Sequence, residues 1–152
     1  MVDLGTQGEL FRDLLNHWDL DSPHVVAHDF GGAVSLRAHP LHGASYASLT
    51  LVDVVALRPW GSDYFRLVAD HPKVFAAQTQ AVHRGAVEAY VAGASHRGLT
   101  AVQMDALAAP WLSPEGQGAF YRQIAAADER STDEIEGPVR RAEPAGKRHL
   151  GT

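Results

Sequence analysis

Ala27-His28-Asp29-Phe30-Gly31-Gly32 is the stretch that decides how this sequence folds. It closes a short apolar run that ends at Ala27 and opens a segment, 33–38, whose residues can form a helix. A strand-to-helix turn that presents a reactive side chain between small residues is typical of a nucleophile elbow, usually Gly-x-nucleophile-x-Gly. Here Ala27 and Gly31 occupy the small positions on either side of Asp29. We expect both to be small because the turn is tight and a larger side chain would collide with neighbouring backbone.

The sequence around this turn predicts a parallel β-α-β unit. An amphipathic helix comes first, behind a capping box at 6–9, with apolar residues at positions 10, 11, 14, 15 and 18. One strand is predicted over His24–His28 and a second, rich in β-branched residues, over Leu49–Leu57. The order helix, strand, helix, strand favours an α/β fold with a parallel sheet.

The remainder of the chain predicts helices and then a tail. Helical periodicity without a convincing strand indicates helices at 63–70, 72–91 and 100–109, and a further one that begins at Ser113. After Asp128 the periodicity fades into charged residues, prolines and glycines. We therefore expect three parts: a partial α/β core over 1–60, a helical cap or lid over 61–130, and a disordered tail over 131–152.

The composition excludes several classes of function. The 152 residues carry a net charge of −5, which argues against sequence-independent binding of nucleic acid, since that needs a basic face. No apolar stretch approaches the roughly 20 residues of a membrane span, and the N-terminus is not a secretory signal. The absence of cysteine excludes disulfides, thiol catalysis and Cys-ligated zinc, and it fits a cytoplasmic location. The nine histidines are scattered, so we expect neither a metal site nor a cofactor.

Together these features resemble the α/β-hydrolase superfamily. The stretch 23–59 resembles its nucleophile strand, elbow, following helix and next strand, and the helices after Trp60 resemble its cap domain. The aspartate at the elbow resembles the branch that contains haloalkane dehalogenases, haloacetate dehalogenases and epoxide hydrolases. The resemblance covers residues from about 4 to 136. It implies a partial α/β-hydrolase fold followed by an all-helical cap, with a small molecule as substrate.

Asp29 is the expected nucleophile. A carboxylate is ionised at neutral pH and needs no base to activate it, so it can attack a saturated carbon that carries a halide or belongs to an epoxide. Water would then hydrolyse the alkyl-enzyme ester, with the backbone N–H of Phe30 as half of the oxyanion hole. Asp53 ends the next strand and resembles the acid that orients the catalytic histidine in haloacetate dehalogenases. In other members an aspartate at this place is structural, and both roles stay open.

Three further residues are expected at the substrate pocket. His28, beside the nucleophile, would help to shape the pocket rather than act as a base. Trp60 could line the pocket or donate to halide, because Phe30 replaces the tryptophan that many of these enzymes carry after the nucleophile. Tyr90 is one of several cap tyrosines that could protonate an opening epoxide. The favoured alternative is that these aromatic residues simply pack the cap.

No catalytic histidine is evident. His149 stands in a polar tail without a preceding strand, and the other histidines precede the expected position. We therefore expect the central fragment of a hydrolase, inactive alone, poorly stable, and able to self-associate through exposed sheet edges. One alternative is a non-catalytic remnant or interaction module that keeps the cap surface. Another is a complete small fold in which Asp29 only caps a helix.

Overall fold

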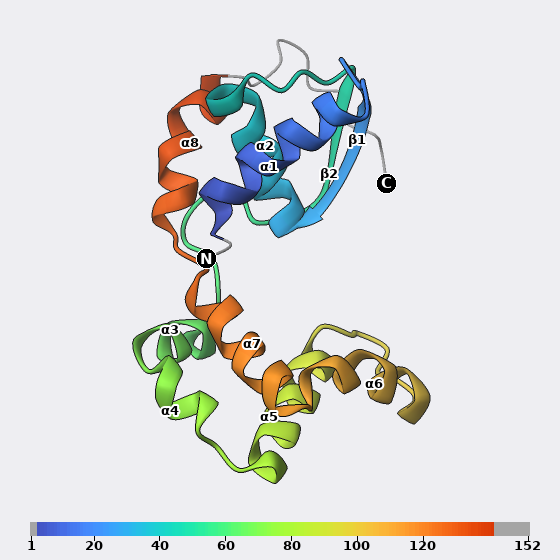
Figure 1. Cartoon of the computed structure of the whole chain (residues 1–152), viewed down its shortest axis with the longest axis vertical. Coiled ribbons are helices and arrows are strands. Elements are labelled where there is room, and N and C mark those ends of the chain that lie inside the picture. Colours follow the sequence, from blue (N-terminus) through green and yellow to red (C-terminus); the bar gives the residue numbers. More distant parts are fainter. Residues whose placement is uncertain (1–2, 142–152) are drawn as a thin grey trace. The chain divides into compact units, whose positions relative to one another are not determined.

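The computed structural model describes residues 3–141 and shows two compact units (Figure 1). The first unit contains the described residues up to Trp60 and those from Asp128 onward, and the second is Gly61–Ala127. The helical region was predicted over 61–130, but residues 128–130 belong to the first unit. Each unit has its own core and is described separately.

The first unit begins with helix α1, Leu4–His17. Its N-cap is Asp3, whose Oδ1 accepts a hydrogen bond from the backbone N–H of Thr6 at 2.8 Å. This hydrogen bond holds the pKa of Asp3 below its usual value. The predicted capping box at 6–9 is wrong, because those residues already lie inside the helix. Asp3 starts the helix earlier, since a side-chain acceptor at the N-cap satisfies a backbone donor of the first turn.

Two parallel strands form the sheet of this unit. β1, His24–Asp29, pairs with β2, Ser48–Val54, in a register that runs from His24 opposite Ser48 to His28 opposite Val52. Helix α2, Phe30–His42, connects them and ends at Gly43, whose φ of 74° favours glycine. The predicted α/β fold with a parallel sheet is thereby confirmed. The second strand is shorter than the predicted 49–57.

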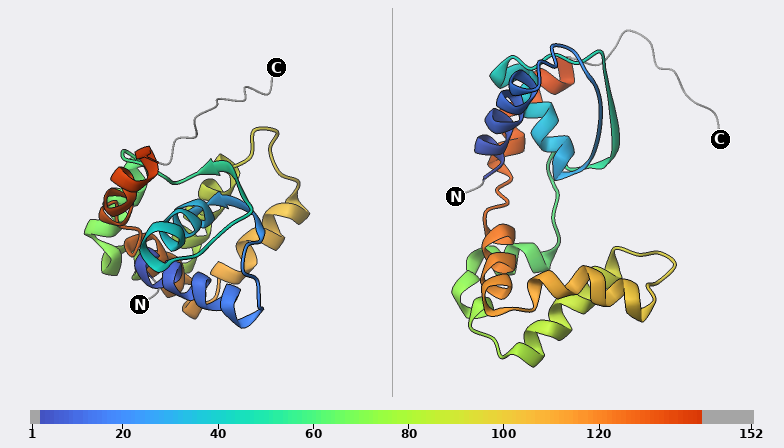
Figure 2. Two further views of the ribbon diagram at one scale, coloured as in Figure 1. Left: turned by 90° about the horizontal axis from the view of Figure 1, so that it is seen from above. Right: turned by 45° about the vertical axis from the view of Figure 1, so that its right-hand side comes forward.

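The two helices cover one face of this sheet. α2 packs against both strands, and α1 packs against α2. In the right-hand view of Figure 2 the strands lie on one side of the unit and the helices on the other. Leu15 of α1 is buried against Ala38 of α2 and Ala44 of the following loop. This hydrophobic cluster of the first unit therefore lies between α1, α2 and the loop that follows α2.

Helix α8, Arg130–Arg141, completes the first unit. Thr132 and Ile135 are fully buried, and α8 packs against α2. The expectation of a disordered tail is therefore wrong for 131–141. Charged residues dominate this helix, but its apolar contact with α2 rests on a few buried side chains that periodicity did not reveal. Residues 142–152, including His149, lie outside the described part of the chain.

The second unit is all helical. Its elements are α3 Asp63–Asp70, α4 Pro72–Ala76, α5 Gln80–Gly93, α6 Ala101–Ala108, a short 3-10 helix Ala109–Trp111, and α7 Pro114–Ala125. The core contains Val68, Val87, Ala108, Phe120, Tyr121 and Ile124. The predicted helix over 72–91 is divided into α4 and α5. No helix within 3–141 combines the length and the apolar character that crossing a bilayer requires.

Candidate active site

Asp29 has the backbone conformation that a nucleophile elbow requires. It is the last residue of β1, directly before the first residue of α2, and has φ 49° and ψ −128°. A residue with a Cβ rarely adopts a positive φ, and such strain costs about 1–3 kcal/mol. Hydrogen bonds on both sides hold the turn. His28 Nδ1 lies 2.7 Å from the carbonyl oxygen of Val52, and the N–H of Val55 donates to the carbonyl of Asp29 at 3.1 Å.

The Asp29 carboxylate does not cap α2. Asp29 is the N-cap residue by position, but its side chain accepts no hydrogen bond from the first turn of the helix. It is exposed, and it forms no ion pair within residues 3–141. The hypothesis that Asp29 serves only as a helix cap is therefore wrong. The carboxylate lies at the end of β1, and its oxygens form no hydrogen bond or ion pair with the described residues.

Gly32 is a position where close packing of α2 on β2 requires a glycine. A Cβ at Gly32 would lie 2.3 Å from Cβ of Val54, at the end of β2. A Cβ at Gly31 would meet nothing within 4 Å of the described structure. The expectation that Gly31 must be small concerns the backbone of the turn itself, and it stays a prediction. Close packing of α2 onto β2 fixes the glycine one position later.

Asp53 occupies the matching place on β2. The register shifts after His28 opposite Val52, so that Asp29 lies opposite Val54 and Asp53 has no partner on β1. Asp53 also has a positive φ, 44°, and is exposed. Two strained aspartates thus stand at the carboxyl ends of adjacent parallel strands. In open α/β sheets this edge is where ligands bind.

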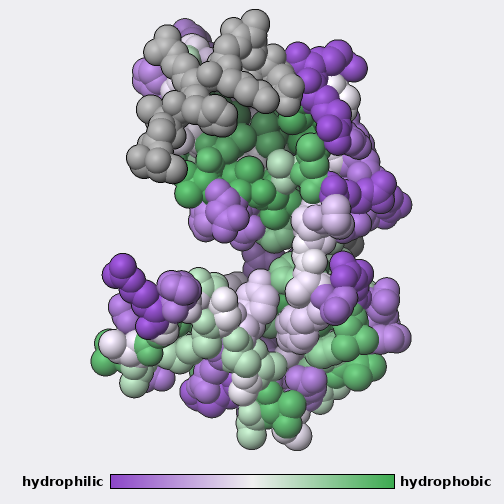
Figure 3. Space-filling model, turned by 180° about the vertical axis from the view of Figure 1, so that it is seen from behind, coloured by the Kyte–Doolittle hydropathy of each residue, from purple (hydrophilic) through white to green (hydrophobic). Residues whose placement is uncertain are grey.

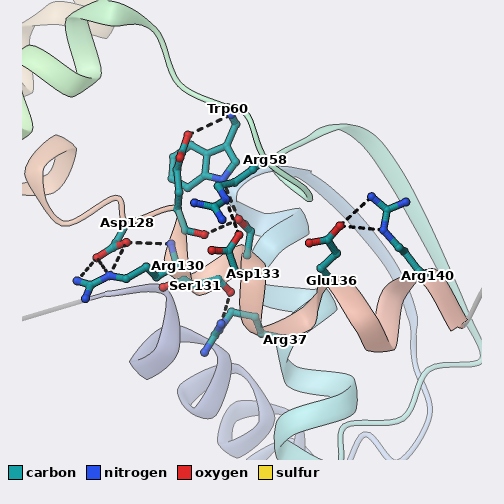
Figure 4. A network of polar contacts seen from close by, with 11 residues as sticks. Arg37, Arg58, Trp60, Asp128, Arg130, Ser131, Asp133, Glu136 and Arg140 are labelled. Carbon is teal, nitrogen blue, oxygen red and sulfur yellow. Dashed lines mark hydrogen bonds and ion pairs between the residues drawn. The ribbon is translucent and has the colours of Figure 1, made fainter.

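Trp60 contacts both the elbow residue Phe30 and the segment that leads into α8, and Figure 4 shows its polar contacts. Its ring packs edge-on against Phe30, with the ring centroids 5.6 Å apart. Its indole N–H donates to Thr132 Oγ1 at 3.0 Å, and its backbone N–H donates to Glu129 Oε1 at 3.4 Å. The indole N–H already has an acceptor, which argues against a role in holding halide. The role of Trp60 is to connect Phe30 to α8.

Phe30 and His28 each have a nitrogen without a hydrogen-bond partner within the described residues: the backbone N–H of Phe30 and Nε2 of His28. Phe30 is the first residue of α2, where a backbone N–H has no acceptor within the helix. A free N–H beside a nucleophile is what an oxyanion hole needs, and the role of Phe30 in one stays a prediction. His28 Nδ1 donates to the carbonyl of Val52, because a carbonyl can only accept, and Nε2 has no hydrogen-bond partner within residues 3–141. His28 is exposed, and its place in a substrate pocket stays a prediction.

Tyr90 lies in the second unit among other aromatic residues. Its ring lies 5.8–6.1 Å from the rings of Tyr64, Phe65 and Phe120. Burial raises the pKa of both Tyr64 and Tyr121 in the same cluster, which keeps these phenols neutral. The aromatic residues therefore pack together, as the favoured alternative predicts. A direct role of Tyr90 toward substrate stays a prediction.

Sequence reasoning missed the polar centre of the second unit. His83 is fully buried, with Nε2 2.8 Å from the carbonyl oxygen of Trp111 and Nδ1 3.0 Å from the hydroxyl of Tyr121. Gln117 donates to the carbonyls of Ala76 and Gln78 nearby. Nothing in the sequence distinguishes His83 from the scattered surface histidines. No group of three histidine or acidic side chains within 3–141 has the arrangement of a metal site.

Comparison with known proteins agrees with this fold. The chain is similar to the crystal structure of an α/β hydrolase fold protein from Burkholderia ambifaria, with 44% sequence identity and a TM-score of 0.86. The similarity covers 90% of this chain and 51% of that chain, so this chain spans about half the length of that protein. No protein-family model and no curated protein matches. The chain has a partial α/β hydrolase fold with a helical region, and the identity supports the α/β hydrolase superfamily.

Proposed function

We propose that this chain provides the nucleophile of an α/β-hydrolase-type enzyme and that Asp29 is that nucleophile. One observation carries the proposal: Asp29 keeps a strained, positive-φ conformation at a strand-to-helix turn while its carboxylate makes no structural contact in the described chain. Strained residues that lack a structural contact are typical of functional sites. The absence of cysteine fits a cytoplasmic location for this activity.

The proposed reaction begins with displacement at a saturated carbon. An Asp29 carboxylate oxygen forms a bond to the carbon, and the bond from that carbon to halide or to the epoxide oxygen breaks. The halide leaves with the electron pair, whereas an epoxide oxygen keeps the pair and takes a proton from solvent. The product is an alkyl ester on Asp29. The N–H of Phe30 would stabilise the oxyanion when water later attacks this ester.

The chain by itself is expected to stop at the ester. Hydrolysis needs a base that activates water, and no histidine of residues 3–141 forms a side-chain hydrogen bond to the carboxylate of Asp29 or Asp53. Asp53 would orient such a histidine if the rest of an enzyme supplied it. A stable ester on this chain is thus the expected sign of a nucleophile without its base.

Covalent labelling tests the proposal directly. The chain is incubated separately with an epoxide, a primary alkyl bromide and bromoacetate, and intact mass and peptide mapping locate the adduct. We expect one adduct per chain, on Asp29, lost in D29N and retained in D53N. Asp19 is a matched control, because it is another exposed aspartate with positive φ, 54°. Equal labelling of Asp19 and Asp29, or full labelling of D29N, would contradict the proposal.

A non-catalytic interaction module is the second proposal. It is favoured by the exposed apolar side chains on the strands, which include Val26 and Val52. Absence of any Asp29 adduct with all three reagents, in a chain that still folds by circular dichroism, would favour this alternative.

A further inference from the structure

Both N–H groups of Trp60 are bound by the residues that begin α8 (Figure 4). The indole N–H donates to Oγ1 of Thr132 at 3.0 Å, and the backbone N–H donates to Oε1 of Glu129 at 3.4 Å. One hydrogen bond on the ring and one on the backbone together restrict how far the ring can rotate. Exposed apolar surface does not distinguish this place, because apolar residues are visible on both units in Figure 3. The paired hydrogen bonds do distinguish it.

Thr132 is the buried end of this connection. The residue is fully buried, and its hydroxyl donates to the carbonyl of Glu129 at 2.7 Å. A hydroxyl has one proton, so an oxygen that donates it elsewhere can only accept from the indole N–H. Serine could make both contacts, whereas valine has nearly the same shape as threonine and can make neither.

The start of α8 gives Thr132 a fixed position. Asp128 Oδ1 accepts the backbone N–H of Arg130 at 2.9 Å, and the carbonyl of Glu129 accepts the backbone N–H of Thr132 at 2.9 Å. These hydrogen bonds close the turn through which the chain enters the helix. The hydroxyl of Thr132 therefore holds the indole of Trp60 from a well-defined point.

The ring of Trp60 extends this restraint to the elbow. It packs edge-on against Phe30, with a centroid distance of 5.6 Å and an interplanar angle of 84°, a favourable geometry for an aromatic pair. Phe30 follows Asp29 directly in the chain. A fixed Phe30 ring therefore limits the rotation of the backbone that carries the Asp29 carboxylate.

Asp29 needs restraint on both sides of its backbone. A positive φ, here 49°, persists only where the surrounding structure enforces it. The β2 side acts on the chain up to Asp29, because His28 Nδ1 donates to the carbonyl of Val52 and the N–H of Val55 donates to the carbonyl of Asp29. Trp60 acts on the residue after Asp29. The two restraints together fix the strained turn.

We propose that Thr132 and Trp60 are positioning residues for the Asp29 nucleophile. The hydroxyl of Thr132 holds the indole, the indole holds the Phe30 ring, and Phe30 orients the turn that presents the carboxylate. Their role rests on the proposed function of Asp29. Attack on a saturated carbon needs the carboxylate oxygen in line with the bond that breaks, so a small rotation of the turn slows the reaction itself.

Labelling kinetics test this proposal. The full chain is incubated with increasing concentrations of whichever of the three reagents labels Asp29 fastest, and intact mass gives the maximal rate and the half-saturating concentration. We expect T132V to lower the maximal rate about tenfold and to leave the half-saturating concentration within about twofold, because misalignment affects attack and not binding. T132S should restore the maximal rate, since serine keeps both hydrogen bonds. Should T132V not fold, W60F removes the same hydrogen bond from its other end and has the same expected result.

E134A is the matched control on the same helix. It removes the contact of Glu134 Oε2 with Arg37, at 2.7 Å, and so loosens α8 from α2 without touching Trp60. Its maximal rate should equal that of the unaltered chain. Full-rate labelling of T132V, equal slowing by E134A, or failure of T132S to restore the rate would overturn the proposal.

Nuclear magnetic resonance separates failure of this proposal from failure of the proposed function. In proton–nitrogen correlation spectra, T132V should shift the indole N–H of Trp60 and the backbone amides of Asp29 and Phe30, whereas E134A should leave all three in place. If the unaltered chain forms no ester with any reagent, the proposed function fails, and these shifts alone decide whether Thr132 positions the turn. Unchanged amides of Asp29 and Phe30 in T132V would defeat the positioning role even where Asp29 is labelled.

Discussion

The proposed chemistry of this chain rests on two single residues at the strand ends. Asp29 and Asp53 both adopt positive φ, at the carboxyl ends of neighbouring strands. The sequence predicted the first from the small residues around it and the second only through its place after an apolar run. It could not predict the backbone strain, because strain depends on the register between two strands 24 residues apart. The shift after His28 leaves Asp53 unopposed, and no local pattern encodes that shift.

Gly32 and Gly31 form a matched pair for testing the packing of the elbow. G32A should lower the free energy of unfolding by about 1–3 kcal/mol, because its Cβ would overlap the Val54 side chain. G31A should be neutral or raise it by about 0.5–1 kcal/mol, since alanine restricts the unfolded chain and meets open space. Urea unfolding of both variants measures the difference. Equal effects would show that α2 does not pack on β2 as described.

Tyr46 should make stability depend on alkaline pH. Burial raises its pKa from 10.0 to about 12, so the folded chain keeps a proton that the unfolded chain releases. The unfolding free energy should therefore fall as the pH rises from about 10 to about 12. Y46F should make this fall shallower, and it should cost about 1 kcal/mol at pH 7 because the hydroxyl no longer donates to the Ser35 carbonyl. Urea unfolding across this pH range tests both effects, and an unchanged slope would contradict the assignment.

Among the elements, those with strong caps or periodicity were predicted and α8 was not. The predicted helix at 63–70 coincides with α3, and Ser113 caps α7 through the N–H of Gly116 at 2.9 Å. α8 combines acidic and basic residues with a proline, Pro138, inside the helix, so its sequence resembles a solvated tail. Its position depends on contacts with residues almost 100 positions away. Arg37 of α2 donates to the Ser131 carbonyl and to Glu134 Oε2, the latter at 2.7 Å.

Two glutamates of α8 form ion pairs of different kinds, one with the buried Arg37 of α2 and one with the exposed Arg140 of α8 itself. E134A should cost about 2 kcal/mol, because the side chain of Arg37 is only 6% exposed and loses its carboxylate partner. E136A should cost about 0.3–0.5 kcal/mol, because the Arg140–Glu136 pair is an exposed i, i+4 contact. Denaturant unfolding gives both values. Similar losses in the two variants would mean that the Arg37 contact does not hold α8.

At the scale of the whole molecule, each of the two units has its own core, so a core substitution should destabilise mainly the unit that contains it. F120A removes a ring that is 6% exposed in the core of the second unit and should cost about 3–5 kcal/mol there. I135A does the equivalent in the first unit, where the side chain is fully buried, at about 2–5 kcal/mol. Hydrogen exchange followed by mass spectrometry should show faster exchange in Gly61–Ala127 for F120A and in α2 and α8 for I135A. Uniformly faster exchange in either variant would indicate one cooperative unit.

The contacts of Trp60 with Glu129 and Thr132, and of Arg58 with Asp133, have a consequence for how the sequence can change over evolution (Figure 4). They join, inside the first unit, the residues that directly precede and follow the helical insertion Gly61–Ala127. Because these contacts hold the two ends of the inserted segment close together, the segment can be replaced by another of different length or sequence. Lineages can exchange, lengthen or remodel it without disturbing the sheet or the elbow. The helical unit can therefore change in sequence while the strand-to-helix turn at Asp29 in the first unit stays the same.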